Sequence, residues 1–176
     1  RKLALTPSGH FVFGFGRDEG SEVVLSWRIP GGLTKQLQVS ITPREYPTQR
    51  VNGVPQGTVT PSKDKLARIR IETALVKNAR KQHSTLQFFE QAFIQPLIGP
   101  KTGVYGSQRI YNGVPKRPHY GVDYAAVVGT LVKAPADATV SLVHDNMYYS
   151  GGTLIMDHGY GLSSTFIHLS EVLVEE

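Results

Sequence analysis

The sequence contains no cysteine among its 176 residues. Disulfide bonds and thiolate metal sites are therefore excluded, and any metal ion must be held by histidine and carboxylate side chains. The sequence also lacks an apolar run long enough to cross a bilayer, so we expect a chain that does not span a membrane. Charged residues are sparse at 19%, and hydrophobic residues make up 40%. These values are typical of an ordinary globular protein with one or two domains.

The chain has 19 basic and 14 acidic residues, which gives a formal net charge of +5. A basic balance favours anionic partners in general. Bacterial cell wall, nucleic acid and acidic lipid headgroups all fit this description, and net charge alone does not choose among them.

The first forty-odd residues show the alternation of β-strands. We predict strands at 10–15, 22–29 and 35–42, with a turn at Pro30-Gly31-Gly32 between the last two. Three short strands with tight turns indicate part of an immunoglobulin-like β-sandwich. Phe11, Phe13 and Phe15 share one face of the first strand, which we interpret as core, with a binding surface as the alternative.

Residues 43–61 are rich in Pro, Gly, Thr and Gln, which is typical of an extended connector. The pattern that follows predicts a helix over 62–82, whose apolar face carries Leu66, Ile69 and Val76. Its other faces are basic, with Lys63, Lys65, Arg68, Arg70, Lys77, Arg80 and Lys81. We interpret them as a solvated surface rather than a grip on nucleic acid or an acidic polymer, because no aromatic residues are interleaved. Nucleic acid is therefore not an expected partner.

After residue 88 the composition again favours β-structure. We predict strands at 129–134, 138–143, 152–157 and 163–168, with an irregular loop at 144–150. In that loop Tyr148 and Tyr149 either line a groove for a peptide or cover a sheet edge. The fold class is thus mainly β, in three parts: a sandwich fragment at 1–45, a connector plus basic helix at 46–90, and a β-sheet domain at 91–176.

His119 and Asp123 are the residue pair with the clearest chemistry. An imidazole nitrogen and a carboxylate oxygen suit zinc, and two ligands close in sequence make half of a site. Pro118 argues against a helix here, and on a straight strand the two Cα atoms would stand roughly 13 Å apart. The segment must therefore bend, and Gly121 is the residue that allows it. The alternative is a surface histidine and an aspartate that caps a turn.

Several motifs in a fixed order resemble those of the lysostaphin-type (LytM-like) zinc endopeptidases, which cut peptide cross-links of bacterial cell walls. They are Gly106-Ser107-Gln108-Arg109, Arg117-Pro118-His119-Tyr120-Gly121-Val122-Asp123, Gly129-Thr130-Leu131-Val132-Lys133-Ala134, His158-Gly159-Tyr160-Gly161 and Phe166-Ile167-His168-Leu169-Ser170. The resemblance implies that His119 and Asp123 are zinc ligands and that His168 is a catalytic histidine. The family's third ligand lies in a later His-x-His motif, which these 176 residues do not contain. From this we expect an incomplete peptidase domain, weak zinc binding and no peptidase activity in this chain.

The resemblance further implies a murein endopeptidase of the periplasm or a secreted one, with peptidoglycan peptides as its partner. The alternative is a non-catalytic LytM-like module that binds cell wall or activates an amidase. Arg109 and Arg117 either orient a substrate carboxylate through paired hydrogen bonds or tie down loops. His158 is expected to be a structural turn residue. A missing strand would expose a sheet edge beside Ile167 and invite self-association there.

Overall fold

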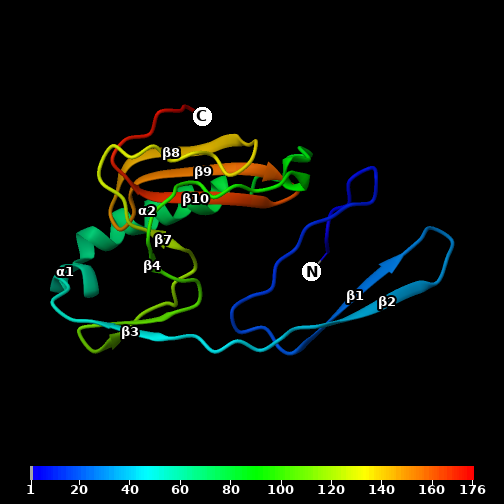
Figure 1. Ribbon diagram of the computed structural model, residues 1–176, viewed down its shortest axis with the longest axis horizontal. Helices are drawn as coiled ribbons and strands as arrows, with labels where there is room; N and C mark the ends of the chain where they lie inside the picture. The colour runs from blue at the N-terminus through cyan, green and yellow to red at the C-terminus, as the bar shows by residue number, and fades with distance from the viewer. Residues whose placement is uncertain (1) are drawn as a thin grey trace.

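The main sheet of the computed structural model, which describes residues 2–176, lies in the C-terminal part of the chain (Figure 1). Its strands are β8 (Thr139–Met147), β9 (Gly151–Gly159) and β10 (Leu162–Leu169), all antiparallel, with β9 in the centre. Seven of the nine residues of β9 are buried, because both neighbours and a helix cover it. The small core gathers here and comprises Ala79, Leu142, Met147 and Ile155. The predicted mainly β class is confirmed.

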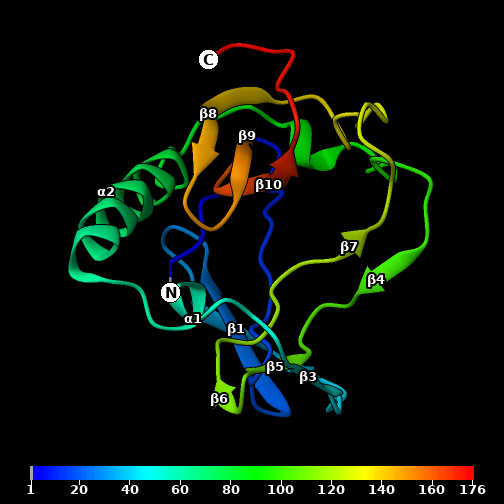
Figure 2. The same ribbon diagram turned by 90° about the vertical axis from the view of Figure 1, so that its left-hand side faces the viewer.

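The predicted basic helix is α2 (Lys63–Ala79), which packs against β8 (Figure 2). The face that meets the sheet is shifted from the predicted apolar face, with which it shares Ile69 and Val76. Ala79 and Glu72 are buried and Val76 is half-buried, whereas Leu66 and Leu75 remain 39% and 38% exposed. The apolar periodicity of this helix is weak, and its buried face includes Glu72, which hydrogen-bonds to the β8–β9 hairpin.

Glu72 joins α2 to the tip of the β8–β9 hairpin. Its Oε2 accepts the backbone N–H of Tyr148 at 2.8 Å, and its Oε1 accepts the guanidinium Nε–H of Arg68 at 2.6 Å. Arg68 in turn donates to the backbone carbonyl of Asn146. Burial by itself raises the pKa of Glu72, but these hydrogen bonds outweigh it and hold the pKa below its ordinary value. Glu72 and Arg68 therefore hold the tip of the β8–β9 hairpin against α2.

The remaining strands form three small sheets. They are β1 (Glu22–Arg28) with β2 (Thr34–Ser40), β4 (Lys101–Gly103) with β7 (Asp123–Tyr124), and β3 (Thr48–Val51) with β5 (Gln108–Tyr111) and β6 (Val114–Pro115). The short helix α1 (Gln56–Val59) follows β3, and a 3-10 turn, η1 (Phe88–Glu90), follows α2. β3 pairs with β5 in parallel, so the predicted connector supplies a strand to the C-terminal part of the chain. The division at residues 45 and 90 stays a prediction.

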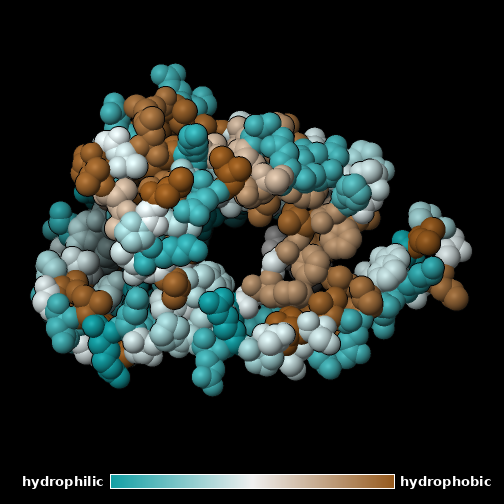
Figure 3. Space-filling model, viewed as in Figure 1, coloured by the Kyte–Doolittle hydropathy of each residue, from teal (hydrophilic) through white to brown (hydrophobic). Residues whose placement is uncertain are grey.

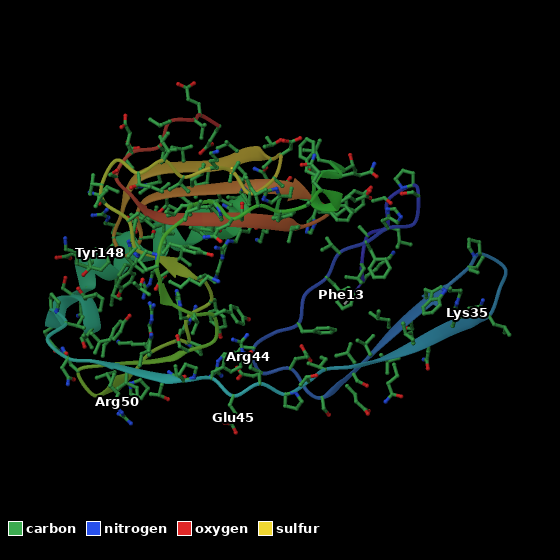
Figure 4. All side chains as sticks on the ribbon, viewed as in Figure 1. Phe13, Lys35, Arg44, Glu45, Arg50 and Tyr148 are labelled. Atoms are coloured by element: carbon green, nitrogen blue, oxygen red, sulfur yellow. The ribbon has the colours of Figure 1, made fainter. Side chains whose placement is uncertain are left out.

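The N-terminal strands do not form a sandwich within the described residues. β1 and β2 make a two-stranded antiparallel hairpin that projects from the molecule, without a second sheet against it (Figures 1 and 3). Trp27 on this hairpin is 46% exposed. The strand predicted at 10–15 is wrong, since the segment has no strand partner there and Phe11, Phe13 and Phe15 are 41%, 38% and 37% exposed. Phe13 lies on the coil between the main sheet and the hairpin (Figure 4).

Two further expectations for the C-terminal part are corrected. Residues 129–134 form no strand, because their backbone makes only isolated bonds, such as that from the Lys133 N–H to the Pro96 carbonyl at 2.9 Å. The segment 144–150 is not an irregular loop throughout, since β8 continues to Met147 across a register shift. Among residues 2–176, no helix has the length and apolar character needed to cross a membrane.

Candidate active site

The loop between β4 and β5 holds His119 through both its backbone and its ring. The His119 N–H donates to the Ser107 carbonyl at 2.9 Å, and its carbonyl accepts the Gly106 N–H at 2.7 Å. Its ring Nδ1 lies 3.1 Å from the carbonyl oxygen of Val104. Ser107 is fully buried, and its hydroxyl donates to the same Val104 carbonyl at 3.0 Å. The orientation of the imidazole is therefore set by the protein itself.

Residues from the N-terminal part of the chain contact this loop at Gly106. Its φ of +88° lies in the left-handed region that favours glycine, and a Cβ here would stand 2.0 Å from the Tyr46 ring. Arg17 donates from Nε to the Gly106 carbonyl at 2.6 Å and lies over the Tyr46 ring, 4.6 Å from its centroid. The loop that positions His119 is thus held from outside by residues distant in sequence.

Asp123 begins β7 and pairs with Gly103 of β4. Its carboxylate lies against Gly103 so closely that a Cβ there would stand 2.2 Å from Oδ2. Only glycine leaves room for the acid in this position. The sequence reading missed Gly103, although a glycine inside a short strand is a recognised sign that another group approaches closely.

His119 and Asp123 come together because the chain bends at Gly121, as the pattern predicted. The imidazole Nε2 lies 3.0 Å from the carboxylate Oδ1. Two ligands bound to one tetrahedral zinc ion at about 2.0–2.1 Å would stand roughly 3.3 Å apart. The His119 side chain is only 12% exposed, and that of Asp123 is 39% exposed. The pair is thus open to a ligand from one side.

Both nitrogens of the His119 ring face oxygen acceptors. A neutral imidazole carries one N–H, and Nδ1 can donate it to the Val104 carbonyl, which only accepts. The lone pair of Nε2 then points at the Asp123 carboxylate, which is repulsive unless a proton or a cation lies between them. The donor set and spacing therefore fit a zinc ion, with the Val104 carbonyl as the outer partner that such a ligand needs.

The two arginines predicted to bind substrate occupy different environments. Arg109 donates from Nη2 to Asp123 Oδ2 at 2.7 Å, so it orients the acid on the side away from His119. The Arg117 side chain is exposed and makes no hydrogen bond or ion pair within residues 2–176. The structure therefore gives Arg109 a positioning contact and leaves Arg117 available, and substrate binding by either residue stays a prediction.

A groove of about 320 Å³ runs beside the His119 ring. Its walls include Arg117, Tyr120 and, from the hairpin tip, Tyr149. Burial raises the pKa of Tyr149 above its ordinary value, and the neighbouring Tyr148 adds to the shift. Tyr149 therefore stays neutral and donates its hydroxyl proton to the Thr58 carbonyl at 3.4 Å. Of the two interpretations of Tyr149, the groove wall is the one that the structure supports.

His168 lies near the end of β10, where the pairing with β9 shifts in register. Its side chain is exposed, its N–H donates to the Ser150 carbonyl at 2.7 Å, and its φ of +62° is unusual for a residue with a Cβ. Within residues 2–176, no three His, Cys, Asp or Glu side chains gather closely enough to hold a metal ion. His168 is therefore not assembled with the His119–Asp123 pair, and its catalytic role stays a prediction.

His158 has a structural position, although it lies in β9 and not in a turn. It is fully buried, with Nδ1 at 2.9 Å from the Asp137 carbonyl and Nε2 at 2.9 Å from the Ser164 hydroxyl. The Phe93 ring packs against it at 4.9 Å between centroids. Both ring nitrogens are satisfied inside the protein, which leaves none for a metal.

Part of this chain is similar to known proteins. The model of peptidase family M23 matches residues 117–176, a range that includes His119, Asp123 and His168. An uncharacterized metalloprotease of Haemophilus influenzae is 41% identical over 59 residues, which are 34% of this chain and 12% of that protein. The peptidoglycan DD-endopeptidase ShyA of Vibrio cholerae is 34% identical over 59 residues, which are 34% of this chain and 14% of that protein.

The fold has a counterpart among solved structures. A crystal structure of a candidate M23 peptidase from Pseudomonas aeruginosa aligns with 98% of this chain at a TM-score of 0.67 and 24% identity. The alignment covers 64% of that protein, so this chain spans less than two thirds of it and about an eighth of the two curated relatives. Residues 117–176 are thus similar to peptidase family M23, and the two relatives and the fold agree with this similarity.

Proposed function

We propose that this chain is part of a zinc-dependent endopeptidase that hydrolyses peptide cross-links of bacterial peptidoglycan. The observation that carries the proposal is the His119–Asp123 pair, in which Nε2 and Oδ1 face each other at 3.0 Å while the other ring nitrogen is engaged by a carbonyl. An M23 segment and a relative named as a peptidoglycan endopeptidase support the choice of substrate. We place the protein in the cell envelope, periplasmic or secreted, because that is where this substrate lies.

His119 and Asp123 would hold the zinc ion, which as a Lewis acid polarises a scissile carbonyl and lowers the pKa of a bound water. The protein contributes the orientation of both ligands. The Val104 carbonyl holds the imidazole ring, the Ser107 carbonyl holds the His119 backbone, and Arg109 holds the second carboxylate oxygen of Asp123. With two ligands among the described residues, residues 1–176 on their own are expected to bind zinc weakly and to leave peptidoglycan intact.

Arg117 and His168 have separate proposed tasks. Arg117 is exposed on the wall of the groove, where its guanidinium would pair with a free carboxylate of the peptide. His168 would hold or move a proton near the reacting carbonyl in an arrangement that brings the end of β10 closer to the His119–Asp123 pair than it lies in this structure. Its left-handed backbone conformation costs on the order of 1–3 kcal/mol, a strain that structures keep mainly at functional positions.

Zinc titration of the chain against a chromophoric chelator tests the proposal directly. Wild-type protein should take up one zinc ion per chain. His119→Ala should weaken that binding by more than about tenfold, since even the loss of an outer partner of a ligand weakens metal binding to this extent. The matched control is His10→Ala, which removes an exposed histidine whose ring contacts Glu90, and neither residue lines the groove.

Equal zinc affinity of wild type and the His119→Ala variant would refute the assignment of His119 as a ligand. A loss of the same size in the control variant would show that zinc binds histidines at the surface without a built site. A protein that binds zinc through His119 and attaches to peptidoglycan, yet remains inactive in its full-length form, would support the non-catalytic module instead.

A further inference from the structure

The net charge of this protein is concentrated in a single segment. Residues 63–81 contain seven of the 19 basic residues and two of the 14 acidic residues. The rest of the chain therefore has 12 basic and 12 acidic residues. The whole formal charge of +5 is therefore carried by α2 and the two residues that follow it. A surface that is basic only to keep a protein soluble has no need of such concentration.

The cations form a regular stripe on the outer face of the helix. Lys63, Arg70 and Lys77 are exposed and follow one another at intervals of seven residues, so they lie on nearly the same line, about 10 Å apart along the axis. Ala67 and Ala74 occupy the positions between them. Figure 2 shows α2 at the outside of the molecule, with its other face toward the main sheet. The stripe is thus long, straight and uncovered.

The helix withdraws one of its two acids from this surface. Glu72 is buried on the opposite face, where Arg68 and the Tyr148 N–H bind it. The other acid, Asp64, lies in the first turn of the helix. Glu72 therefore cannot neutralise the stripe, and the positive charge of the stripe remains available to an anionic ligand.

On the Glu72 side, opposite the stripe, the start of α2 approaches the groove beside His119. Lys65, at the start of α2, lies over the Tyr148 ring, 5.7 Å from its centroid. The rings of Tyr148 and Tyr149 are in contact at 4.8 Å, and Tyr149 lines the groove. The hairpin tip thus lies between the start of α2 and the groove.

We propose that the outer face of α2 is a docking site for carboxylate-bearing peptidoglycan, separate from the groove and outside the M23 segment. The proposal rests on the proposed function for the identity of the polymer. The stripe has alanines between its cations and no aromatic side chain. It therefore lacks the stacking surfaces used for single-stranded nucleic acid and the continuous apolar stripe of helices that insert into membranes. Spaced cations on a straight face suit a rigid polymer with regularly repeated carboxylates.

Sedimentation with purified insoluble peptidoglycan, freed of attached polymers, tests the proposal at increasing salt concentrations. The test protein is the triple variant Lys63→Gln, Arg70→Gln, Lys77→Gln, in which glutamine preserves helix propensity. The control is Lys35→Gln, Lys101→Gln, Lys133→Gln, which removes three exposed charges elsewhere, one of them near the end of the projecting hairpin (Figure 4). The helix variant should bind about tenfold more weakly at low salt, as expected from the loss of three exposed ion pairs. The control variant should bind like wild type.

Peptidoglycan whose carboxylates have been converted to amides should lose wild-type binding to the same extent, and this arm does not depend on how any variant folds. Equal losses in both triple variants, or undiminished binding to the amidated polymer, would overturn the proposal. So would tighter binding to duplex DNA or to anionic lipid vesicles than to peptidoglycan. Zinc titration of the helix variant should match wild type, so a failure of the docking site and a failure of the metal site are seen separately.

Discussion

Replacing Glu72 by glutamine removes one negative charge from the junction between α2 and the tip of the β8–β9 hairpin. The carboxylate accepts the Arg68 Nε–H at 2.6 Å and the Tyr148 N–H at 2.8 Å. Glutamine has the same shape but only one acceptor atom, so its NH₂ group must face one of these donors. One hydrogen bond is therefore lost and replaced by a repulsive contact, while the other becomes a neutral bond.

A hydrogen bond to a charged group contributes roughly 1.5–3 kcal/mol. The Arg68 side chain is 41% exposed, so solvent screens its half of the interaction and the lower end of that range applies. We expect Glu72→Gln to lower the free energy of unfolding by about 2 kcal/mol, because one such bond is lost and the other is weakened to a neutral bond. For a chain of this length, that corresponds to a fall in Tm of about 4–8 °C. The measurement is thermal and urea unfolding followed by circular dichroism, with Glu45→Gln as the control, because Glu45 points into solvent (Figure 4).

The effect should depend on pH in a defined direction. The pKa of Glu72 is lowered in the folded protein, so its carboxylate stabilises the fold fully above its ordinary value of 4.5. That contribution is lost as the pH falls through the lowered pKa. The difference in Tm between wild type and Glu72→Gln should therefore be constant from about pH 7 to pH 5.5 and shrink at about pH 4 and below. A variant as stable as wild type at neutral pH, or a difference that persists undiminished in acid, would refute the reasoning.

Two further substitutions test the packing around the site and the sheet. Gly103→Ala places a methyl group 2.2 Å from Asp123 Oδ2, so the acid must move away from Arg109. We therefore expect this variant to bind zinc more weakly than wild type in the same titration. An unchanged zinc affinity would show that the carboxylate relocates freely. His158→Ala removes two buried hydrogen bonds and leaves a cavity, for an expected loss of about 3 kcal/mol in urea unfolding. A loss below about 1 kcal/mol would contradict its structural role, because typical buried sites cost more.

The sequence by itself determined those features that depend on neighbours along the chain. The β-type composition of the C-terminal segments located β9 and β10, and the helical pattern located α2 within three residues of its ends. The bend at Gly121 followed from the ligand types of His119 and Asp123 and the length of an extended chain. In these cases the physical cause is a local periodicity or a local steric freedom, which depends only on residues that are close together in the sequence.

Tertiary structure decided which alternating segments became strands. Residues 10–15 and 129–134 have the pattern of strands but no continuous partner, whereas the polar segment 48–51 becomes β3 because β5, some sixty residues later, offers a parallel edge. A strand is stable only when its N–H and C=O groups find a ladder, and that partner is not encoded in the strand itself. The same reason hid the contacts of the site. Gly103 makes room for Asp123, Arg109 pairs with it, and Val104 orients His119, each through an approach between segments that only the folded chain brings together.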